Sequence, residues 1–382
     1  MVEKINIFWG PDAVFENAIG GLRNPFSLSN LLNYLNRQEI IISNLQTEDH
    51  QTKETICLKV EELIVHTDDY GGLNEWALLG FSNNVLENPK VDVRNVWLSN
   101  PPLKIYEDIK RYYSSNQIKE HYPEHSSISI DVMKQLASGY DGVVVGQNHV
   151  IQQVLSAIYA LRNPGRIKPI TLLFLGDSGV GKTETAKYIA LCMKEEMVRV
   201  QFSMQQTYNA SQFIFGAEHG QNSLARELIR RKSNVILLDE FDKVSPAFYN
   251  AFYQMFDEGV FVDSNYAVDV KNSIIICTTN FHDEHDAERH LGSAIYSRFS
   301  KVIKFNRIST ESKLRIASKT YTEVVVQLST EDRELLPNGT VLPFFENQIR
   351  EGLYSNIRML KNDIEDAVYF ELLKAHGIIR GT

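Results

Sequence analysis

The sequence of 382 residues has little cysteine and no long apolar run. Its cysteines, Cys57, Cys192 and Cys277, lie far apart and show no Cys-x-x-Cys spacing. They cannot form a disulfide framework or an evident zinc site, which favours a reducing compartment. No run approaches the roughly 20 apolar residues that span a bilayer, and the start, MVEKINIFWG, has no secretory pattern. We expect a cytoplasmic protein without a membrane span.

The sequence also has no excess of basic residues, and its formal net charge is −9. This balance argues against a nucleic-acid partner, which needs a basic surface to neutralise phosphates. Arg230, Arg231 and Lys232 form the only tight basic cluster. Three basic residues at the end of a helix are typical of a solvated cap that complements the helix dipole, and we predict that role for them.

Internal repeats and low-complexity segments are absent as well, so the domains must be read from shifts in composition. Ser114–Ser129 is polar, rich in serine and interrupted by Pro123, which is typical of a linker or exposed loop. We therefore predict an amino-terminal domain over residues 1–113, a linker over 114–131, a large domain over 132–307 and a small helical domain over 308–382.

The amino-terminal domain has the pattern of a small α+β module, in which no residues have catalytic spacing. Runs rich in β-branched and aromatic residues predict strands, and helical spacing of apolar residues predicts two helices. The predicted strands are Lys4–Trp9, Glu39–Ile42, Thr55–Val65, Glu75–Phe81 and Val91–Leu98, and the helices are Leu28–Arg37 and Lys104–Tyr113.

Beyond the linker, strands and helices alternate. Ile170–Leu175, Asn234–Leu238 and Ser273–Thr278 are continuous apolar runs, as in strands buried on both faces of a parallel sheet. Their alternation with helices predicts an α/β fold, a doubly wound parallel sheet with ligands at the carboxyl ends of its strands. Helical patterns at Thr310–Leu328 and Ile357–Lys374 predict the closing domain.

The first of these runs leads into a phosphate-binding motif. Gly176–Thr183, GDSGVGKT, matches GxxxxGK[ST], follows a strand and opens a helix. Glycines let successive backbone N–H groups point at phosphate oxygens, and the helix amino terminus adds its positive dipole. Lys182 would neutralise the β and γ phosphates, and the Thr183 hydroxyl would bind Mg²⁺. The predicted ATP-binding residues here are Gly176, Asp177, Ser178, Gly179, Val180, Gly181, Lys182, Thr183 and Glu184.

The second apolar run ends in two acids, Asp239 and Glu240. At a strand end beside the phosphate loop, Asp239 would hold Mg²⁺ through its water shell. Glu240 would polarise the attacking water. The two motifs together predict an ATPase that uses Mg²⁺-ATP.

From Val144 to Lys374 the chain resembles the ATPase module of the Clp family of AAA+ protein unfoldases, most of all the second module of ClpB and ClpC. The matching pieces occur in the family's order. They are VVGQ at Val144–Gln147, LLFLGDSGVGKTETAKYIA at Leu172–Ala190, VRVQFS at Val198–Ser203, VILLDEFDKVSP at Val235–Pro246, FDEGVFVDS at Phe256–Ser264, IIICTTN at Ile274–Asn280, YSRFSKVIKF at Tyr296–Phe305 and YSNIRMLKNDIEDA at Tyr354–Ala367.

The resemblance implies further roles. Val145, Gly146 and Gln147 match the segment that packs near the adenine. Asn280 matches the first sensor, which positions the attacking water with Glu240. Arg298 matches the arginine finger, which acts on the site of a neighbouring subunit and so implies a homo-oligomeric ring, such as a hexamer. Arg358, in IRML, matches the second sensor, although NIR here replaces the family's GAR motif with one residue inserted.

One stretch departs from the family. Clp unfoldases carry a loop such as GYVG, whose aromatic residue grips a polypeptide in the central channel. Phe215–Leu224 has the recognisable start of that loop but lacks the gripping tyrosine. We expect Tyr208, Phe213 and Phe215, just upstream, to be packing residues. Threading of a chain through a pore is therefore doubtful, whereas ATP turnover is not.

Three functions follow from these patterns. The leading hypothesis is a Clp-like ring ATPase that remodels a protein partner bound through Met1–Asp131. The second is a nucleotide-controlled switch or scaffold in a multi-protein assembly, without unfolding activity. The third is a nucleic-acid motor or loader, against which the acidic composition argues.

Overall fold

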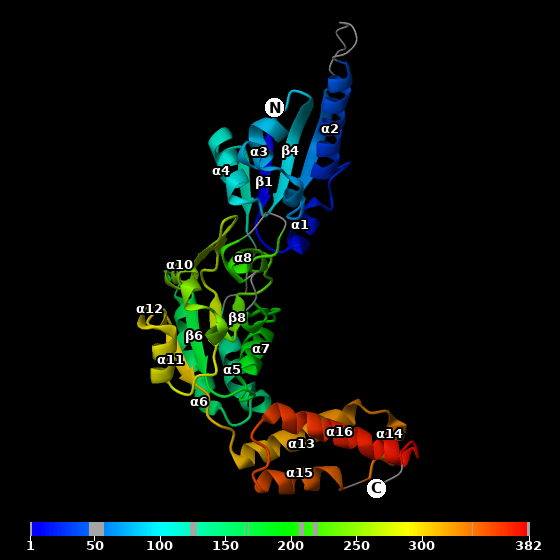
Figure 1. The fold of residues 1–382 in the computed structure, drawn as a ribbon, viewed down its shortest axis with the longest axis vertical. Coiled ribbons are helices and arrows are strands. Elements are labelled where there is room, and N and C mark those ends of the chain that lie inside the picture. The colour runs from blue at the N-terminus through cyan, green and yellow to red at the C-terminus, as the bar shows by residue number, and fades with distance from the viewer. Residues whose placement is uncertain are drawn as a thin grey trace.

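The computed structural model describes residues 2–45, 57–122, 128–163, 165–166, 168–205, 210–216, 221–337 and 339–379. Three bodies follow one another along its long axis (Figure 1), namely an amino-terminal domain, a central α/β domain and a carboxyl-terminal helical domain. No helix in the described ranges combines the length and apolar character that crossing a bilayer demands.

The amino-terminal domain contains a five-stranded sheet in the order β2-β3-β4-β1-β5, in which every strand pair is parallel. Helices connect the strands, so the domain is α/β and the α+β expectation for it was wrong. Its elements are β1 Lys4–Phe8, α1 Asp12–Ile19, β2 Phe26–Ser27, α2 Leu28–Leu45, β3 Leu58–Val65, α3 Glu75–Leu79, β4 Val91–Ser99, α4 Leu103–Tyr112 and β5 Ile118–His121.

Three local predictions in this domain also differ from the structure. Residues Glu39–Ile42 continue helix α2. The preference of β-branched residues against a helix is weak, and the longer helix around them outweighs it. Glu75–Phe81 begins with helix α3, which Asn74 caps by accepting a hydrogen bond from the Ala77 amide. The expected linker Ser114–Ser129 contains strand β5, which pairs with β1, so the amino-terminal sheet extends to His121.

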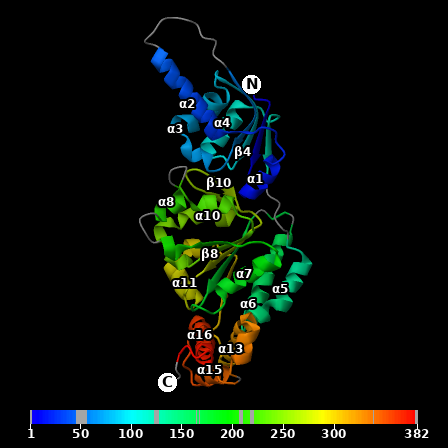
Figure 2. The same ribbon diagram turned by 90° about the vertical axis from the view of Figure 1, so that its right-hand side faces the viewer.

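The central domain confirms the predicted doubly wound sheet, with strands ordered β12-β6-β11-β8-β7 and all pairs parallel. Helices cover both faces (Figure 2), with α5, α6 and α7 on one and α10 and α11 on the other. Its elements are α5 Ile130–Val143, α6 Asn148–Ile158, β6 Ile170–Leu175, α7 Lys182–Cys192, β7 Val198–Gln201, α8 Ala210–Phe215, α9 Leu224–Ile229, β8 Val235–Asp239, α10 Asn250–Glu258, β9 Val260–Val262, β10 Ala267–Asp269, β11 Ile274–Thr278, α11 Glu284–Leu291, α12 Ser293–Tyr296 and β12 Lys301–Lys304.

Alternation along the central strands produces two separate cores. In β6, Leu172 and Phe174 pack with the helices on one face, whereas Leu173 and Leu175 pack with those on the other. Successive side chains of a strand point to opposite faces, so a continuous apolar run fills both cores. The sheet is held rigidly between them, and its carboxyl edge therefore provides a firm base for a binding site.

The helical domain packs around its own core, in which Ala317, Phe345, Leu360 and Ile364 are buried. Val145 of the central domain also belongs to this core, so it lies where the two domains meet. The four helices are α13 Thr310–Gln327, α14 Thr330–Leu335, α15 Val341–Arg350 and α16 Ile357–Ala375.

The amino-terminal domain is docked on the central one. Trp9 packs against the cores of both domains, and the Leu103 amide donates to the Asn265 carbonyl at 2.7 Å. Asp68 forms ion pairs with Arg226 and with Arg230, the latter at 2.8 Å. These contacts join the carboxyl edge of one parallel sheet to helix α9 and the β9–β10 hairpin of the other domain.

The basic cluster after α9 is therefore only partly the solvated cap that we predicted. Arg230 pairs with Asp68, and Arg231 is buried and donates to the carbonyls of Leu228 and Asp269 at 2.9 and 2.6 Å. Burial lowers the pKa of Arg231 to about 10. Lys232 alone of the three pairs on the surface, with Glu196.

Candidate nucleotide site

The loop between β6 and α7 has a backbone that requires glycine. Gly181 has φ +106°, and a Cβ there would lie 2.5 Å from Val144 Cγ1. Gly176 has φ +133°, and a Cβ there would lie 2.8 Å from the Phe305 carbonyl oxygen. Such positive φ values turn the loop back on itself ahead of helix α7. The first-turn residues Lys182, Thr183 and Glu184 thereby reach the carboxyl edge of the sheet.

The two acids of β8 lie at the same edge but in different environments. Asp239 is buried, and it accepts hydrogen bonds from the Thr278 hydroxyl and from the Arg199 guanidinium. Glu240 has φ +56°, a strained backbone for a residue with a Cβ, and its amide donates to the Thr278 hydroxyl at 2.9 Å. Thr278, the last residue of β11, thus fixes the turn that carries both acids.

Lys182 lies inside the loop. Its ammonium group donates to the carbonyls of Gly176 and Asp177, the second at 2.8 Å, and to Asn280 Oδ1 at 3.4 Å. Burial lowers the pKa of Lys182 to about 8, against the opposing charges of Asp239 and nearby carboxylates. A lysine that loses solvation in this way gains strongly from an anionic ligand.

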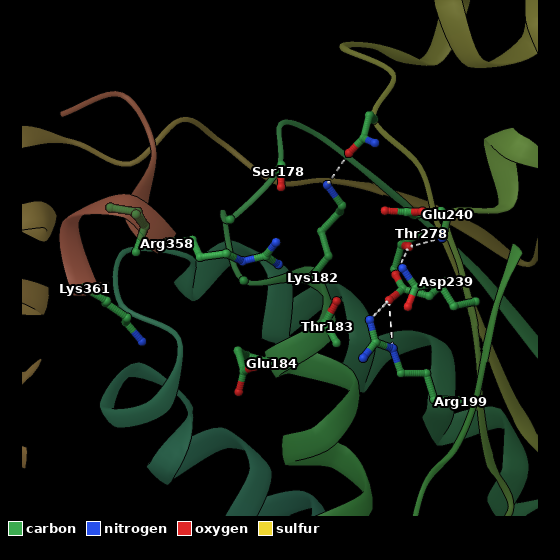
Figure 3. A pocket seen from close by; sticks show the side chains of 15 residues that line it. Ser178, Lys182, Thr183, Glu184, Arg199, Asp239, Glu240, Thr278, Arg358 and Lys361 are labelled. Carbon is green, nitrogen blue, oxygen red and sulfur yellow. Dashed lines mark hydrogen bonds and ion pairs between the residues drawn. The ribbon is translucent and has the colours of Figure 1, made fainter. Parts of the chain in front are cut away.

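A cavity of about 490 Å³ joins these groups, within the usual range for small-molecule sites. Arg358 and Lys361 of helix α16 face it from the helical domain (Figure 3). Its lining includes Ser178, Gly179, Gly181, Lys182, Thr183, Glu184, Arg199, Gln201, Asp239, Glu240, Thr278, Asn280 and Arg358. Polar groups from both domains therefore converge on one opening.

The predicted adenine segment has two different roles. Val145 lines a smaller, largely apolar cavity of about 70 Å³, which shares Gly179 and Gly181 with the larger one. Gln147 is fully buried and binds the carbonyls of Val180 and Asn306 at 3.3 and 2.7 Å. Gly146 lies against Ser312 of α13. Gln147 therefore connects the phosphate loop with the segment after β12, and Gly146 lies against the helical domain. Of the three residues, Val145 lines the smaller cavity.

The remaining loop residues are distributed as follows. Val180 packs in the core beneath the loop and contributes its carbonyl to Gln147. Asp177 forms ion pairs with His282 and with Arg307 at 3.2 and 3.1 Å, beside the cavity. Glu184 lines the cavity and pairs with Lys187 on α7.

Arg298 does not line the cavity of its own chain. It precedes β12, and its carbonyl accepts from Thr171 at the beginning of β6, at the opposite edge of the sheet from the phosphate loop. Its guanidinium pairs with Asp257 at 2.8 Å and lies 4.2 Å from the centre of the Tyr253 ring. A role for Arg298 in hydrolysis therefore requires a second subunit.

The residues at the cavity suit Mg²⁺. Magnesium prefers oxygen ligands and is usually held by one or two protein groups together with substrate phosphates. Thr183 and Asp239 both face the cavity and supply a hydroxyl and a carboxylate. The donor set fits a magnesium–nucleotide complex bound through the phosphates.

A parallel sheet with a glycine loop after strand β6 and two acids at the end of strand β8 defines a P-loop nucleotide-binding domain. The family described as "AAA domain (Cdc48 subfamily)" matches residues 168–327. Similar proteins include Chaperone protein ClpB of Bacillus cereus (36% identity over 157 residues, 37% of this chain and 18% of the relative). ClpB of Mycoplasmoides gallisepticum is 28% identical over 235 residues, 55% of this chain and 32% of that protein. The AAA+ ATPase ClpV1 of Pseudomonas aeruginosa is 35% identical over 152 residues, 36% of this chain and 17% of that protein.

The central domain therefore has the P-loop AAA+ fold, and its sequence is similar to ClpB and ClpV1. The chain spans 17% to 32% of the length of these three relatives.

Five residues that line the cavity were not predicted from the sequence, namely Arg199, Gln201, Thr278, Ile357 and Lys361. Arg199 lies in a piece that matched the family, but no spacing connected it to Asp239. Thr278 was read only as the last residue of an apolar strand, although its hydroxyl binds both acids. Lys361 lies one helical turn after Arg358, and that i, i+3 spacing was a signal for a second cation on the same face.

Proposed function

We propose that this chain binds and hydrolyses ATP and uses the cycle to remodel or switch a protein partner, as a Clp-like member of a multi-subunit ring. The single observation that carries the proposal is the convergence of Lys182, Thr183, Asp239 and Glu240 on one cavity, which α16 faces from the helical domain.

The proposed mechanism assigns one task to each group. The loop amides and Lys182 bind the β and γ phosphates, and Asn280 together with Glu240 orients and polarises the water that attacks the γ phosphorus. Thr183 and Asp239 would hold Mg²⁺, which would supply positive charge to neutralise the phosphates. Arg358 would contact the γ phosphate from the helical domain and so link its loss to domain rotation.

The multi-subunit part of the proposal is supported by Arg298. Because this arginine lies away from its own cavity, a trans arrangement in which it serves a neighbouring subunit accounts for its match to the family's arginine finger. A homo-oligomeric ring, such as a hexamer, supplies such a neighbour. The amino-terminal domain, which lies outside the family match, is the proposed site for the protein partner.

The cytoplasmic location stays part of the proposal. Cys57, Cys192 and Cys277 are unpaired in the structure, and two of them are buried. Unpaired, buried cysteines suit a reducing compartment.

The test is nucleotide turnover by the wild-type chain and by Lys182→Ala and Glu240→Gln. Lys182→Ala should lose binding, because the cation that neutralises the phosphates is gone. Glu240→Gln should retain ATP and trap assembled rings, because only the chemical step needs the carboxylate. Turnover undiminished in both variants would refute the assignment.

A second function, a nucleotide-controlled switch or scaffold without unfolding activity, is favoured by the loop at Phe215–Leu224. Part of it, like Tyr208, lies outside the described residues, but its flanks are packed. Phe213 is buried in the central core and the Phe215 ring contacts Phe248 edge-on at 5.5 Å. The burial of Phe213 removes it as a gripping residue, and Phe215 is partly buried in its contact with Phe248. ATP-driven unfolding of a tagged, unstructured substrate by this chain would exclude the switch.

A further inference from the structure

Arg199 on the edge strand β7 forms an ion pair with Asp239. Its Nε and Nη2 atoms both donate to Asp239 Oδ2, at 2.9 and 2.6 Å. The other carboxylate oxygen, Oδ1, accepts from the Thr278 hydroxyl. Both oxygens of the proposed magnesium residue are therefore occupied by protein donors (Figure 3).

The two partners differ sharply in exposure. The Asp239 side chain is 8% exposed, whereas the Arg199 side chain is 43% exposed and lines the cavity. A buried carboxylate without a counter-ion is costly, so it needs a cation in every state of the site. An exposed guanidinium can leave that position without being buried elsewhere, because water can solvate it.

Magnesium and Arg199 would compete for one carboxylate oxygen. A water bound to Mg²⁺ must donate to Asp239, and the oxygen facing the cavity already accepts two N–H groups from Arg199. A divalent cation and a guanidinium at the same oxygen also repel each other. Binding of the magnesium–nucleotide complex is therefore favoured by withdrawal of Arg199.

We propose that Arg199 is a positioning residue that holds the Asp239 carboxylate in the metal-free site and releases it when the magnesium–nucleotide complex binds. It thereby sets the Mg²⁺ concentration that nucleotide binding requires. This inference rests on the proposed function, because it needs a chain that binds nucleotide with Mg²⁺ through Asp239.

The first experiment measures binding of a fluorescent ADP analogue as Mg²⁺ is titrated. Arg199→Gln should lower the Mg²⁺ concentration for half-maximal binding by roughly three- to tenfold, the size expected when a partly exposed charged hydrogen bond no longer competes. Lys361→Gln removes the same charge from the same cavity without contact to Asp239. It should leave the Mg²⁺ requirement unchanged, although overall nucleotide affinity falls.

The second readout is thermal unfolding. Without nucleotide, Arg199→Gln should unfold at a lower temperature than the wild type, because Asp239 loses its counter-ion. With saturating Mg²⁺ and ADP this difference should disappear, because the metal replaces the arginine. An arginine that only secured the edge strand would cost the same stability in both conditions, and that result would refute the proposal.

Arg199→Lys keeps the charge but not the forked donor, and it is the variant to use if Arg199→Gln does not fold. Its Mg²⁺ requirement should fall between those of the wild type and the glutamine variant. If the wild type binds nucleotide but these variants need as much Mg²⁺ as the wild type, or more, the proposed role of Arg199 is refuted. The proposed function then still stands. A wild type that shows neither binding nor a thermal shift with Mg²⁺ and ADP overturns the proposed function instead.

Discussion

Lys182 illustrates how a single side chain can be costly in one state and useful in another. In the structure its ammonium group is bound by two loop carbonyls and is largely withdrawn from water. Desolvation disfavours the charged form, which is why its pKa falls to about 8. A triphosphate in the loop would restore the charge by direct attraction.

This shift predicts how nucleotide affinity depends on pH. Above pH 8 the free lysine loses its proton, whereas the bound lysine keeps it, so binding must take up a proton. Affinity should fall by roughly tenfold per pH unit above pH 8, which is the limiting slope for one proton. Calorimetry near pH 9, in two buffers with different ionisation enthalpies, should report an uptake approaching one proton per nucleotide; an uptake of zero would contradict the burial of Lys182.

The site residues that could be predicted from the sequence belong to local motifs. The phosphate loop and the acids of β8 each combine a buried strand with a short polar signature, so neighbouring residues in the sequence are neighbours in space. Arg199 and Asp239 come together through the parallel pairing of β7 with β8, in which Gln201 lies opposite Asp239. Nothing in the sequence fixes that register, and the contact could only be found in the structure.

At the scale of elements, the loop between β6 and α7 depends on backbone geometry more than on side chains. Gly181→Ala should lower the free energy of unfolding by about 2 kcal/mol and abolish nucleotide binding, because positive φ strains alanine and its Cβ would meet Val144. Chemical denaturation and a binding titration check both parts.

Gly142 provides the matched control. It lies in helix α5, and a Cβ there would contact nothing within 4 Å. Gly142→Ala should leave nucleotide binding intact and stabilise the chain by up to about 1 kcal/mol, because alanine favours helix. If Gly181→Ala and Gly142→Ala changed nucleotide binding and stability equally, the backbone geometry of the loop would not explain the effect of Gly181→Ala.

Errors in predicting the elements were confined to the amino-terminal domain. The central strands are continuous apolar runs that end in polar or glycine-rich motifs, and these motifs secured their assignment. In the amino-terminal domain, Glu39–Ile42 is short and extends a helix that began at Leu28, and tertiary context outweighed its β preference. Ile118–His121 carries polar residues at the sheet edge, which concealed a strand inside an expected linker.

At the scale of the whole molecule, the ion pairs of Asp68 with Arg226 and Arg230 should help to hold the amino-terminal domain on the central domain. Asp68→Ala removes the acid that joins Arg226 and Arg230, and an exposed carboxylate of this kind contributes about 1 kcal/mol or less. The Leu103 amide, which donates across the interface, should then exchange its hydrogen a few-fold faster.

Glu75→Ala is the control for that measurement. The substitution breaks the exposed ion pair between Glu75 and Lys104 and removes one negative charge, as Asp68→Ala does. Both partners of this pair lie within the amino-terminal domain. Exchange at Leu103 should stay at the wild-type rate. Acceleration by Glu75→Ala alone would show that the interface does not depend on Asp68.

The proposed ring makes a quantitative prediction about mixtures of two inactive variants. Lys182→Ala lacks the phosphate-binding cation and Arg298→Ala lacks the trans finger, so rings of either variant should hydrolyse no ATP. In a random equimolar mixture, a site works when its loop comes from the Arg298 variant and its finger from the Lys182 variant, which holds for about a quarter of interfaces. Mixing should therefore restore up to about a quarter of wild-type turnover, measured as phosphate release after subunit exchange. If the mixture stays inactive although mixed rings form, the trans role of Arg298 is refuted, and its contacts with Asp257 and Tyr253 are purely structural.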